Sequence, residues 1–226
     1  MYFNGTKCCL LIFCSVLSLS VIAKDAKKIA EGQGLVKPLC FVENKGQVKD
    51  LDNNPRTDIQ YKLSTPGMDL YVGNGQLHYQ FNKIEGDLKN NPSGSSYRMD
   101  VMLIGANPAA KVVTADNNRY YERYYNENTG SEGVVAHAYN RVTYKNVYPN
   151  IDWVVYVKNN KVEYDFVVNP GGDASQIRFK YDGATDLSVN ADGNLSAKTP
   201  IGAVEEKKPY AEKLKKYFKN KSDNRF

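Results

Sequence analysis

Carboxylates on one expected hairpin have the spacing in this chain that most resembles acid–base chemistry. Glu163 and Asp165 lie two residues apart in an expected strand, so their side chains share one face and could pair as acid and base. Asp152 stands at the start of the preceding strand. We favour ordinary roles for all three, as solvent-facing charges or as acceptors of hydrogen bonds from turn amides.

Other candidates for catalysis or metal binding carry weaker signals. The two histidines, His78 and His137, have no ligand spacing such as His-x-x-x-His. Residues 190–194 (NADGN) resemble a calcium loop but lack its further acidic ligands, and Gly193 is better explained as a turn residue. Residues 171–173 have no phosphate-loop context. The sequence therefore predicts no catalytic residue, no metal site and no cofactor.

Tyrosine is the unusual component, with 17 Tyr against a single Trp. Tyr120, Tyr121, Tyr124 and Tyr125 form two close pairs, and exposed tyrosines can stack on sugar rings or anchor a protein contact. In a strand, alternation would instead turn half of them toward the core. These four are the candidate ligand-contact residues.

The first residues are typical of a secretory signal peptide. Lys7 supplies the positive charge, residues 8–22 form a short apolar run, and Ala23 precedes an abrupt change to polar sequence at Lys24. The run is short for a membrane span, which needs about 20 apolar residues. A lipoprotein is disfavoured because the bulky Phe13 precedes Cys14. We expect cleavage after Ala23 and no stable membrane span afterwards.

Cysteine usage and charge limit the remaining classes. Three of the four cysteines lie in this leader, so only Cys40 remains, and we expect it to be a small buried hydrophobe. The net charge of +5 falls to about +4 without Lys7, and much of that excess lies in residues 207–208 and 213–225. Elsewhere the two signs are interleaved, which argues against nucleic acid as a partner.

Period-2 segments bounded by turn residues dominate the chain after residue 38. The clearest are residues 151–158 and 161–168, joined by Asn159-Asn160, and we expect Trp153 and Phe166 on their inward faces and Glu163 on a wetter opposite face. Residues 68–72 and 76–82 flank a second hairpin signal, Gly-Asn-Gly. Residues 119–125 fit either a strand or a short helix.

Together these patterns predict an all-β fold, an antiparallel β-sandwich or two packed β-sheets, with a short C-terminal tail that could be helical. The expected division is a signal peptide at 1–23, a flexible lead-in at 24–37, a β-rich domain at 38–210 and a basic tail at 211–226. Within the β-rich domain, two lobes could meet near residues 126–140.

An ordered series of phrases resembles a domain of unknown function of Bacteroidota and other bacteria. The phrases are residues 41–47 (FVENKGQ), 144–152 (YKNVYPNID), 162–173 (VEYDFVVNPGGD) with Ile177, 192–195 (DGNL), 199–202 (TPIG) and 208–210 (KPY). That family usually has Gly where this chain has Asn150. The resemblance covers roughly residues 41–210 and implies a position ahead of SBBP (β-propeller-type) repeats, PKD-like domains or a type IX sorting domain. It brings no catalytic residues, and no such repeats follow Tyr210, so a fragment, a stand-alone paralogue and a truncated product all stay open.

Two functions compete on this basis. The first is a non-catalytic structural or interaction module of a secreted or cell-surface bacterial protein, with a protein or glycan partner at the cell surface. The second is a carbohydrate-binding β-sandwich module that uses exposed tyrosines. An enzyme is not expected.

Overall fold

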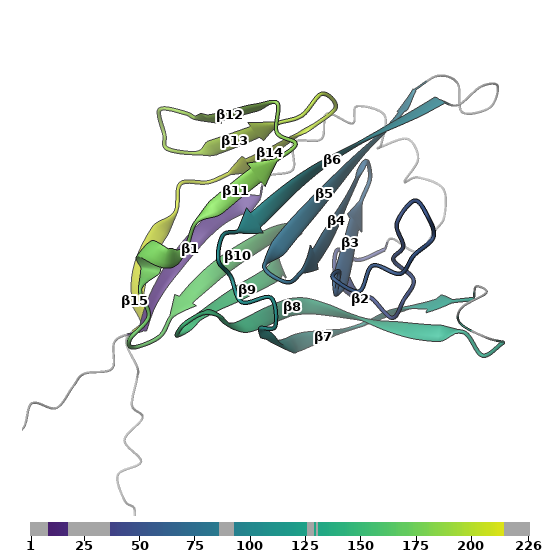
Figure 1. Cartoon of the computed structure of the whole chain (residues 1–226), viewed down its shortest axis with the longest axis horizontal. Helices are drawn as coiled ribbons and strands as arrows, with labels where there is room; N and C mark the ends of the chain where they lie inside the picture. The colour runs from purple at the N-terminus through teal and green to yellow at the C-terminus, as the bar shows by residue number, and fades with distance from the viewer. Residues whose placement is uncertain (1–8, 18–36, 86–92, 126–128, 130, 215–226) are drawn as a thin grey trace, which may run out of the picture.

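The computed structural model describes residues 9–17, 37–85, 93–125, 129 and 131–214, and in this part of the chain nearly all regular structure is β-strand (Figure 1). The exception is one short 3-10 turn, η1 (Ala174–Gln176), and no α-helix occurs among these residues. The all-β prediction is confirmed.

The strands in chain order are β1 (Cys9–Leu17), β2 (Phe41–Glu43), β3 (Tyr61–Thr65), β4 (Met68–Gly73), β5 (Gln76–Glu85), β6 (Ser93–Leu103), β7 (Lys111–Tyr124), β8 (Val134–Tyr148), β9 (Ile151–Lys158), β10 (Lys161–Val168), β11 (Phe179–Asp182), β12 (Asp186–Val189), β13 (Leu195–Lys198), β14 (Ala203–Glu206) and β15 (Tyr210–Leu214). The larger sheet has the order β11-β6-β5-β4-β3-β2-β8-β9-β10-β1-β15, and β7 pairs with β8 beside this path. A smaller sheet has the order β12-β13-β14. Antiparallel pairing throughout agrees with the short hairpin turns.

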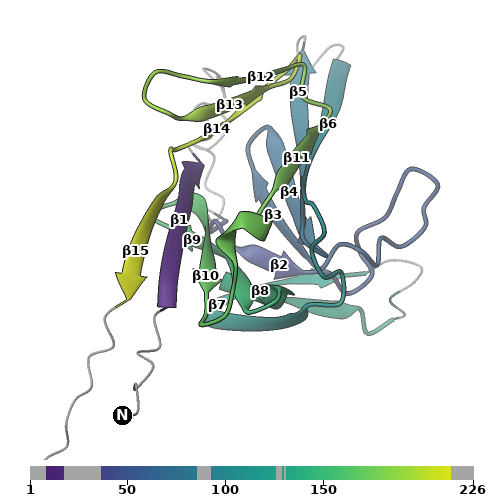
Figure 2. The same cartoon turned by 60° about the vertical axis from the view of Figure 1, so that its left-hand side comes forward.

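Curvature of the larger sheet encloses the core. Strands β3 to β6 stand opposite β8 to β10, as the two views in Figures 1 and 2 show. Large side chains of both halves meet in one buried cluster. Its bulkiest fully buried members are Trp153, Tyr79, Tyr144, Tyr164, Phe41, Phe81 and Phe166. Two layers therefore pack face to face, but both come from one sheet folded over on itself, and the smaller sheet is a separate addition.

Asparagine and glycine in left-handed conformations close the hairpins. Asn159 and Asn160 have φ of 50° and 57° between β9 and β10, and Asn74 and Gly75 have φ of 50° and 74° between β4 and β5. Two successive positive φ angles match the right-handed twist of the flanking strands. Asn150 has φ of 58°, which explains why glycine suits the same place in the resembling family.

The β9–β10 hairpin has the predicted bounds and inward residues, but its outer face is drier than expected. Phe166 is the direct cross-strand partner of Trp153, and each is 1% exposed. On the outer face, Tyr156 and Asp165 are also buried, at 5% and 8% exposure, while Glu163 is only partly exposed. The expectation of a wet outer face is therefore wrong for most of this hairpin.

The smaller sheet is tied to the larger one through a buried carboxylate. Glu206 of β14 is 5% exposed and accepts hydrogen bonds of 2.7 Å from the hydroxyls of Tyr164 and Tyr181. Burial raises the pKa of this carboxyl, and the two phenol donors oppose that rise. The link sets where the chain leaves β14 and enters β15.

Strand limits correct several local expectations. Residues 119–124 are strand, which settles the choice between strand and helix. The tail begins as strand β15, so a helix from residue 211 is wrong over residues 211–214. The rest of the basic tail, 215–226, lies outside the described residues, as does most of the lead-in at 24–37.

The N-terminal segment has an unexpected position. Residues 9–17, inside the expected signal peptide, form strand β1 between β10 and β15, and the rest of that leader lies outside the described residues. Among the described residues, the structure contains no helix long and apolar enough to cross a membrane.

Candidate binding surface

Strands β7 and β8 extend beyond the curled sheet as a two-stranded arm (Figure 1). Residues 134–137 of β8 pair with residues 121–124 of β7, whereas the following residues of β8 pair with β2 and β9 as well. The four candidate tyrosines lie on this arm.

Strand β7 contains a bulge beside these tyrosines. Asn117 pairs with Tyr139 and Tyr121 pairs with His137, so β7 has two more residues than β8 between these pairs. Just before the bulge, Asp116 has φ of 56°, and the Asn118 side chain accepts a hydrogen bond of 3.0 Å from the backbone N–H of Tyr120. Because the bulge adds an even number of residues, the alternation of β7 keeps the same phase before and after it.

The four tyrosines fall on two different faces. Tyr120 and Tyr124 pack against a small buried cluster whose members are Cys40, Val42, Ala136 and Ala138. Tyr121 and Tyr125 point away from it and are 55% and 62% exposed. The structure therefore does not bring all four residues to one site: Tyr120 and Tyr124 are partly buried on one face, and Tyr121 and Tyr125 are exposed on the other.

Glu122 holds the inner pair in place. Its carboxylate accepts a hydrogen bond of 3.0 Å from the Tyr120 hydroxyl and another from the Tyr124 hydroxyl. It also forms an ion pair with Lys37. Burial and the neighbouring carboxylate raise the pKa of Tyr120 to about 12. Burial also raises the pKa of the Cys40 thiol beneath them, so the predicted role of Cys40 as a buried hydrophobe is confirmed.

The opposite face of the arm combines aromatic rings with cations. Arg119 and Arg123 alternate with the exposed tyrosines, and the guanidinium of Arg123 lies 3.4 Å from the Tyr125 hydroxyl. Exposed His137 is the cross-strand partner of Tyr121. We call Arg119, Tyr121, Arg123, Tyr125 and His137 the arm face. It offers flat rings for stacking and positive charge for an acidic partner.

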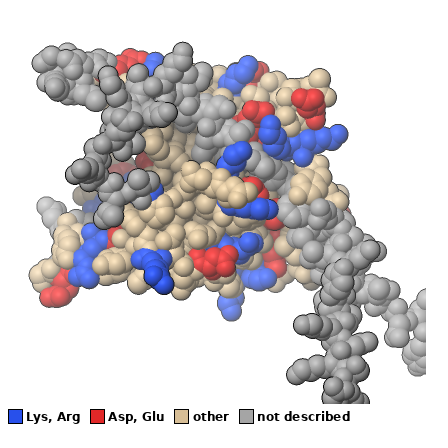
Figure 3. Space-filling model, turned by 180° about the vertical axis from the view of Figure 1, so that it is seen from behind, with Lys and Arg blue, Asp and Glu red and all other residues tan. Residues whose placement is uncertain are grey.

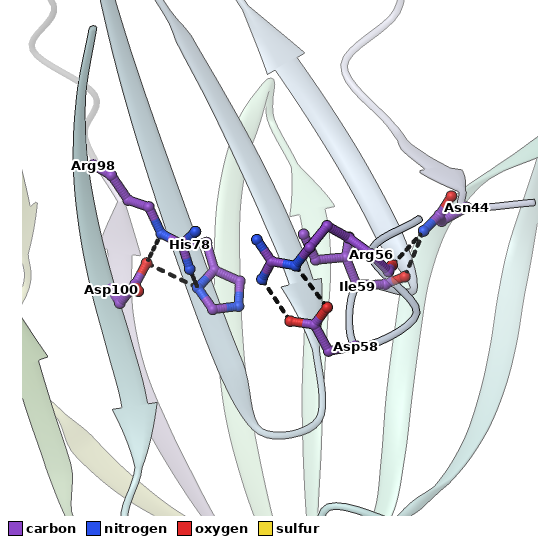
Figure 4. A network of polar contacts seen from close by, with 7 residues as sticks. All are labelled: Asn44, Arg56, Asp58, Ile59, His78, Arg98 and Asp100. Atoms are coloured by element: carbon purple, nitrogen blue, oxygen red, sulfur yellow. Dashed lines mark hydrogen bonds and ion pairs between the residues drawn. The ribbon is translucent and has the colours of Figure 1, made fainter. Parts of the chain in front are cut away.

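His78 belongs to a polar network on the outer face of β3 to β6 (Figure 4). Its Nδ1 lies 2.8 Å from Asp100 Oδ1, which also accepts a hydrogen bond of 2.7 Å from Arg98 Nε. Burial of Asp100 acts to raise its pKa, but these two donors prevail and lower it to about 2. Because Asp100 accepts, Nδ1 carries the proton, and the nearby Arg98 guanidinium cannot donate to it.

The same network secures the loop before β3. Arg56 donates two hydrogen bonds, of 2.8 and 2.6 Å, to Asp58, and the Asn44 side-chain amide donates to the carbonyls of Arg56 and Ile59 (Figure 4). His78 itself is 4% exposed. The bond of buried His78 to Asp100 links β5 to β6, which gives this histidine a structural role.

The three carboxylates of the β9–β10 hairpin, Asp152, Glu163 and Asp165, all have hydrogen-bond partners. Asp152 accepts from Lys145 Nζ at 2.7 Å and from the backbone N–H of Asn146 at 2.9 Å, a backbone amide of strand β8 at an irregularity of its pairing with β9. Glu163 and Asp165 do converge, since the Tyr156 hydroxyl lies 3.0 Å from one carboxylate and 3.2 Å from the other. Neither carboxylate lines the surface hollow bordered by residues 43–61 with Val112 or the one bordered by residues 104–105, 148 and 175–178.

Asp165 provides a test of this buried arrangement. Burial raises its pKa from 3.8 to about 6, so the folded state holds a proton that the unfolded state releases between these values. The contribution of Asp165 to the free energy of unfolding is thus highest at low pH and falls as the pH rises from 3.8 to about 6. We expect Asp165→Asn, which mimics the protonated form, to raise the Tm by about 2–4 °C at pH 7.5 and to change it little near pH 4. Differential scanning calorimetry at both pH values measures this.

Asp182→Asn is the matched control, because Asp182 is exposed and pairs only loosely with Lys180, at 3.6 Å. Equal effects of the two substitutions at pH 7.5, or a stabilisation by Asp165→Asn that does not change with pH, would contradict the assignment.

Remaining candidates are turns or exposed charges. In the loop that resembles a calcium site, Asn190 Oδ1 accepts hydrogen bonds of 3.0 Å from the backbone N–H groups of Asp192 and Asn194, and Gly193 has φ of 83°, as its turn role requires. Within the described residues, no group of three or more His, Cys, Asp or Glu side chains is placed to hold a metal ion. Positive and negative side chains are interspersed on the rear face of the molecule (Figure 3).

Comparison with known proteins yields one match. A family model described as a domain of unknown function (DUF7948) matches residues 41–218. No curated protein and no solved structure matches the chain.

Proposed function

The chain belongs to the DUF7948 family of domains of unknown function, and we propose that it is a non-catalytic interaction module of a secreted or cell-surface bacterial protein. The observation that carries this proposal is the arm face. Two large aromatic rings lie well exposed on a projecting arm, with an arginine beside each of them.

The composition of the arm face suits a protein contact. Tyrosine and arginine are enriched among the residues that contribute most to protein–protein binding. The underside of the arm is held rigidly by Glu122, Lys37 and the inner tyrosines, so Tyr121 and Tyr125 lose little conformational freedom on binding. The two arginines and His137 favour a partner with acidic groups.

Export is supported by the leader sequence. Lys7, the apolar run and the polar change after Ala23 form the pattern that a signal peptidase recognises. The proposal places the mature chain outside the cytoplasm, starting at Lys24. The family resemblance supports the same compartment through its secreted Bacteroidota members.

A carbohydrate partner is the second candidate, and the spacing of the exposed rings favours it. Tyr121 and Tyr125 are four residues apart on one face, which places them about 13 Å apart along an extended strand. Rings at that separation could each stack on a sugar unit of one extended polysaccharide.

The arm face is tested by Tyr121→Ala combined with Tyr125→Ala. We expect this double variant to lose at least about tenfold in affinity for the partner, because truncating exposed aromatic anchors typically costs more than 1 kcal/mol each. Biolayer interferometry would use immobilised protein against two probes, detergent-solubilised envelope protein of the producing bacterium and a panel of neutral and acidic polysaccharides.

Leu187→Ala combined with Val189→Ala is the matched control, since these side chains are 51% and 65% exposed on the smaller sheet. Saturable binding of envelope protein that only the tyrosine variant weakens supports the first function, and the same result with a polysaccharide selects the second. Binding that both variants retain in full refutes the arm face as the site.

A further inference from the structure

The place of β1 in the larger sheet bears on what the exported chain can bind. β1 pairs antiparallel with β10, from Leu10 opposite Val168 to Leu17 opposite Val162, and antiparallel with β15, from Cys9 opposite Leu214 to Phe13 opposite Tyr210. Figure 2 shows β1 lying beside β15 along the side of the molecule. The same residues form most of the apolar run of the leader.

We propose that the mature chain, once the leader is removed, presents a strand-wide slot between β10 and β15, and that the slot takes up an extended apolar strand of a partner protein. This inference rests on the export proposed above. It names a second kind of contact, made through backbone hydrogen bonds and separate from the arm face.

The relative orientation and separation of β10 and β15 oppose closure of the slot by direct pairing of these two strands. Because β10 and β15 both run antiparallel to β1, they are parallel to each other and lie two strand spacings apart, about 10 Å. Direct pairing would require β15 to move by one spacing and adopt a different hydrogen-bond pattern.

The two edges of the slot are anchored differently: β10 keeps a neighbouring strand, whereas β15 pairs with β1 alone among the described strands and is tethered by the segment before it. β10 is paired with β9 along its whole length, from Lys161 to Val168. The chain enters β15 four residues after Glu206, whose carboxylate is bonded to Tyr164 of β10 and to Tyr181. Removing β1 would leave a row of unpaired N–H and C=O groups on both strands, which is the usual template for strand addition.

The side chains of β10 define the chemistry of the occupant. Its core face is apolar, with Val162, Tyr164, Phe166 and Val168 all buried. On its other face, Glu163 and Asp165 stand opposite Val16 and Phe13 of β1. Acidic residues there would be repelled, so the fitting strand is an uncharged, predominantly apolar segment of about the length of β1, like the CLLIFCSVL sequence it replaces.

Hydrogen exchange on the exported protein tests the slot. Intact mass first establishes whether the recovered chain begins at Lys24. The probe is a synthetic peptide of residues 9–17 with Cys9→Ser and Cys14→Ser and lysine tags for solubility, and the control peptide also carries Ile12→Pro, which removes a strand N–H donor. We expect the amides of β10 to exchange at least about tenfold more slowly with the probe peptide, and at an unchanged rate with the control peptide.

The full-length chain made without export gives a second, independent measurement. With β1 retained, the amides of β10 should be protected without any peptide. Ile12→Pro should speed their exchange, whereas Ile12→Val should not, because valine is a good strand residue.

Two other outcomes would each refute the slot. If the exported chain begins at Lys24 but β10 is already protected without peptide, or gains no protection from it, the slot is refuted while export stands. If residues 9–17 are still present in the exported chain, cleavage after Ala23 is wrong and the slot falls with it, while the arm face is unaffected.

Discussion

Replacing Trp153 with alanine should lower the free energy of unfolding by about 3–5 kcal/mol, the usual cost of truncating a large buried aromatic residue. Trp153 is 1% exposed, its ring lies 5.1 Å from that of Tyr144 and 6.4 Å from that of Tyr164, and Phe166 is its direct cross-strand partner. A cavity at this position would remove the contacts to the rings of Tyr144 and Tyr164 at once. Urea unfolding followed by circular dichroism measures the loss.

Two further variants, Phe166→Ala and Glu163→Ala, serve as comparisons for Trp153→Ala. Phe166 is as buried as Trp153. Phe166→Ala should therefore lower the free energy of unfolding by a similar amount, since truncating a core Phe to Ala also costs roughly 3–5 kcal/mol. Glu163 is only partly exposed, but Asp165 would still accept the Tyr156 hydrogen bond after its removal, so Glu163→Ala should cost much less. If Glu163→Ala were as damaging as the two aromatic truncations, the assignment of inner and outer faces would be wrong.

Gly73→Ala is expected to destabilise the chain by about 3 kcal/mol, at the upper end of the usual cost of overpacking. A Cβ at Gly73 would stand 2.0 Å from the backbone carbonyl oxygen of Asp58, and no side-chain rotation can relieve a clash with backbone. The segment involved is held to β4 by the hydrogen bond of 2.9 Å from the N–H of Gln60 to the carbonyl of Val72. Movement there would also disturb the pairing of Arg56 with Asp58.

Gly94→Ala is the matched control for that substitution. A Cβ at Gly94 would meet only the carbonyl oxygen of Lys83, at an ordinary contact distance of 3.8 Å. Thermal unfolding of both variants should show a large drop in Tm for Gly73→Ala and almost none for Gly94→Ala. Equal Tm values for the two would mean that the approach of residue 58 to β4 is not as close as the structure has it.

Both predictions concern residues outside the arm face. Trp153 lies in the core and Gly73 at the end of β4. Loss of binding in either variant should therefore follow loss of folding, whereas the double tyrosine variant of the arm should keep its Tm. Measuring stability and binding on all three variants separates a structural effect from a functional one.

Local pattern in the sequence was enough to determine the fold class and the strongest hairpin. The bounds of β9 and β10, the turn at Asn159-Asn160 and the inward orientation of Trp153 and Phe166 follow from alternation and turn chemistry, which act over a few residues. The residue type and apolar neighbours of Cys40 likewise predicted that it is buried, although the residues that cover it come from β7 and β8.

The tertiary structure alone decided which tyrosines of the arm are exposed. The sequence marked all four as candidates, and alternation separates Tyr120 and Tyr124 from Tyr121 and Tyr125, but it does not say which of the two faces is covered. Packing on Cys40 and Val42, about 80 residues earlier in the chain, then selects Tyr120 and Tyr124 as the inner pair.

Long-range contacts likewise decided the environment of the carboxylates and the place of the N-terminal segment. Asp165 alternates like a solvent-facing residue, yet it is buried beside Tyr156, and Glu206 meets Tyr164 only because two sheets come together. Residues 9–17 have the composition of a leader, and no local signal indicates that they fit between β10 and β15. Periodicity reports which side of a strand a residue occupies, but what covers that side depends on segments far away in the sequence, which is why only the folded chain reveals it.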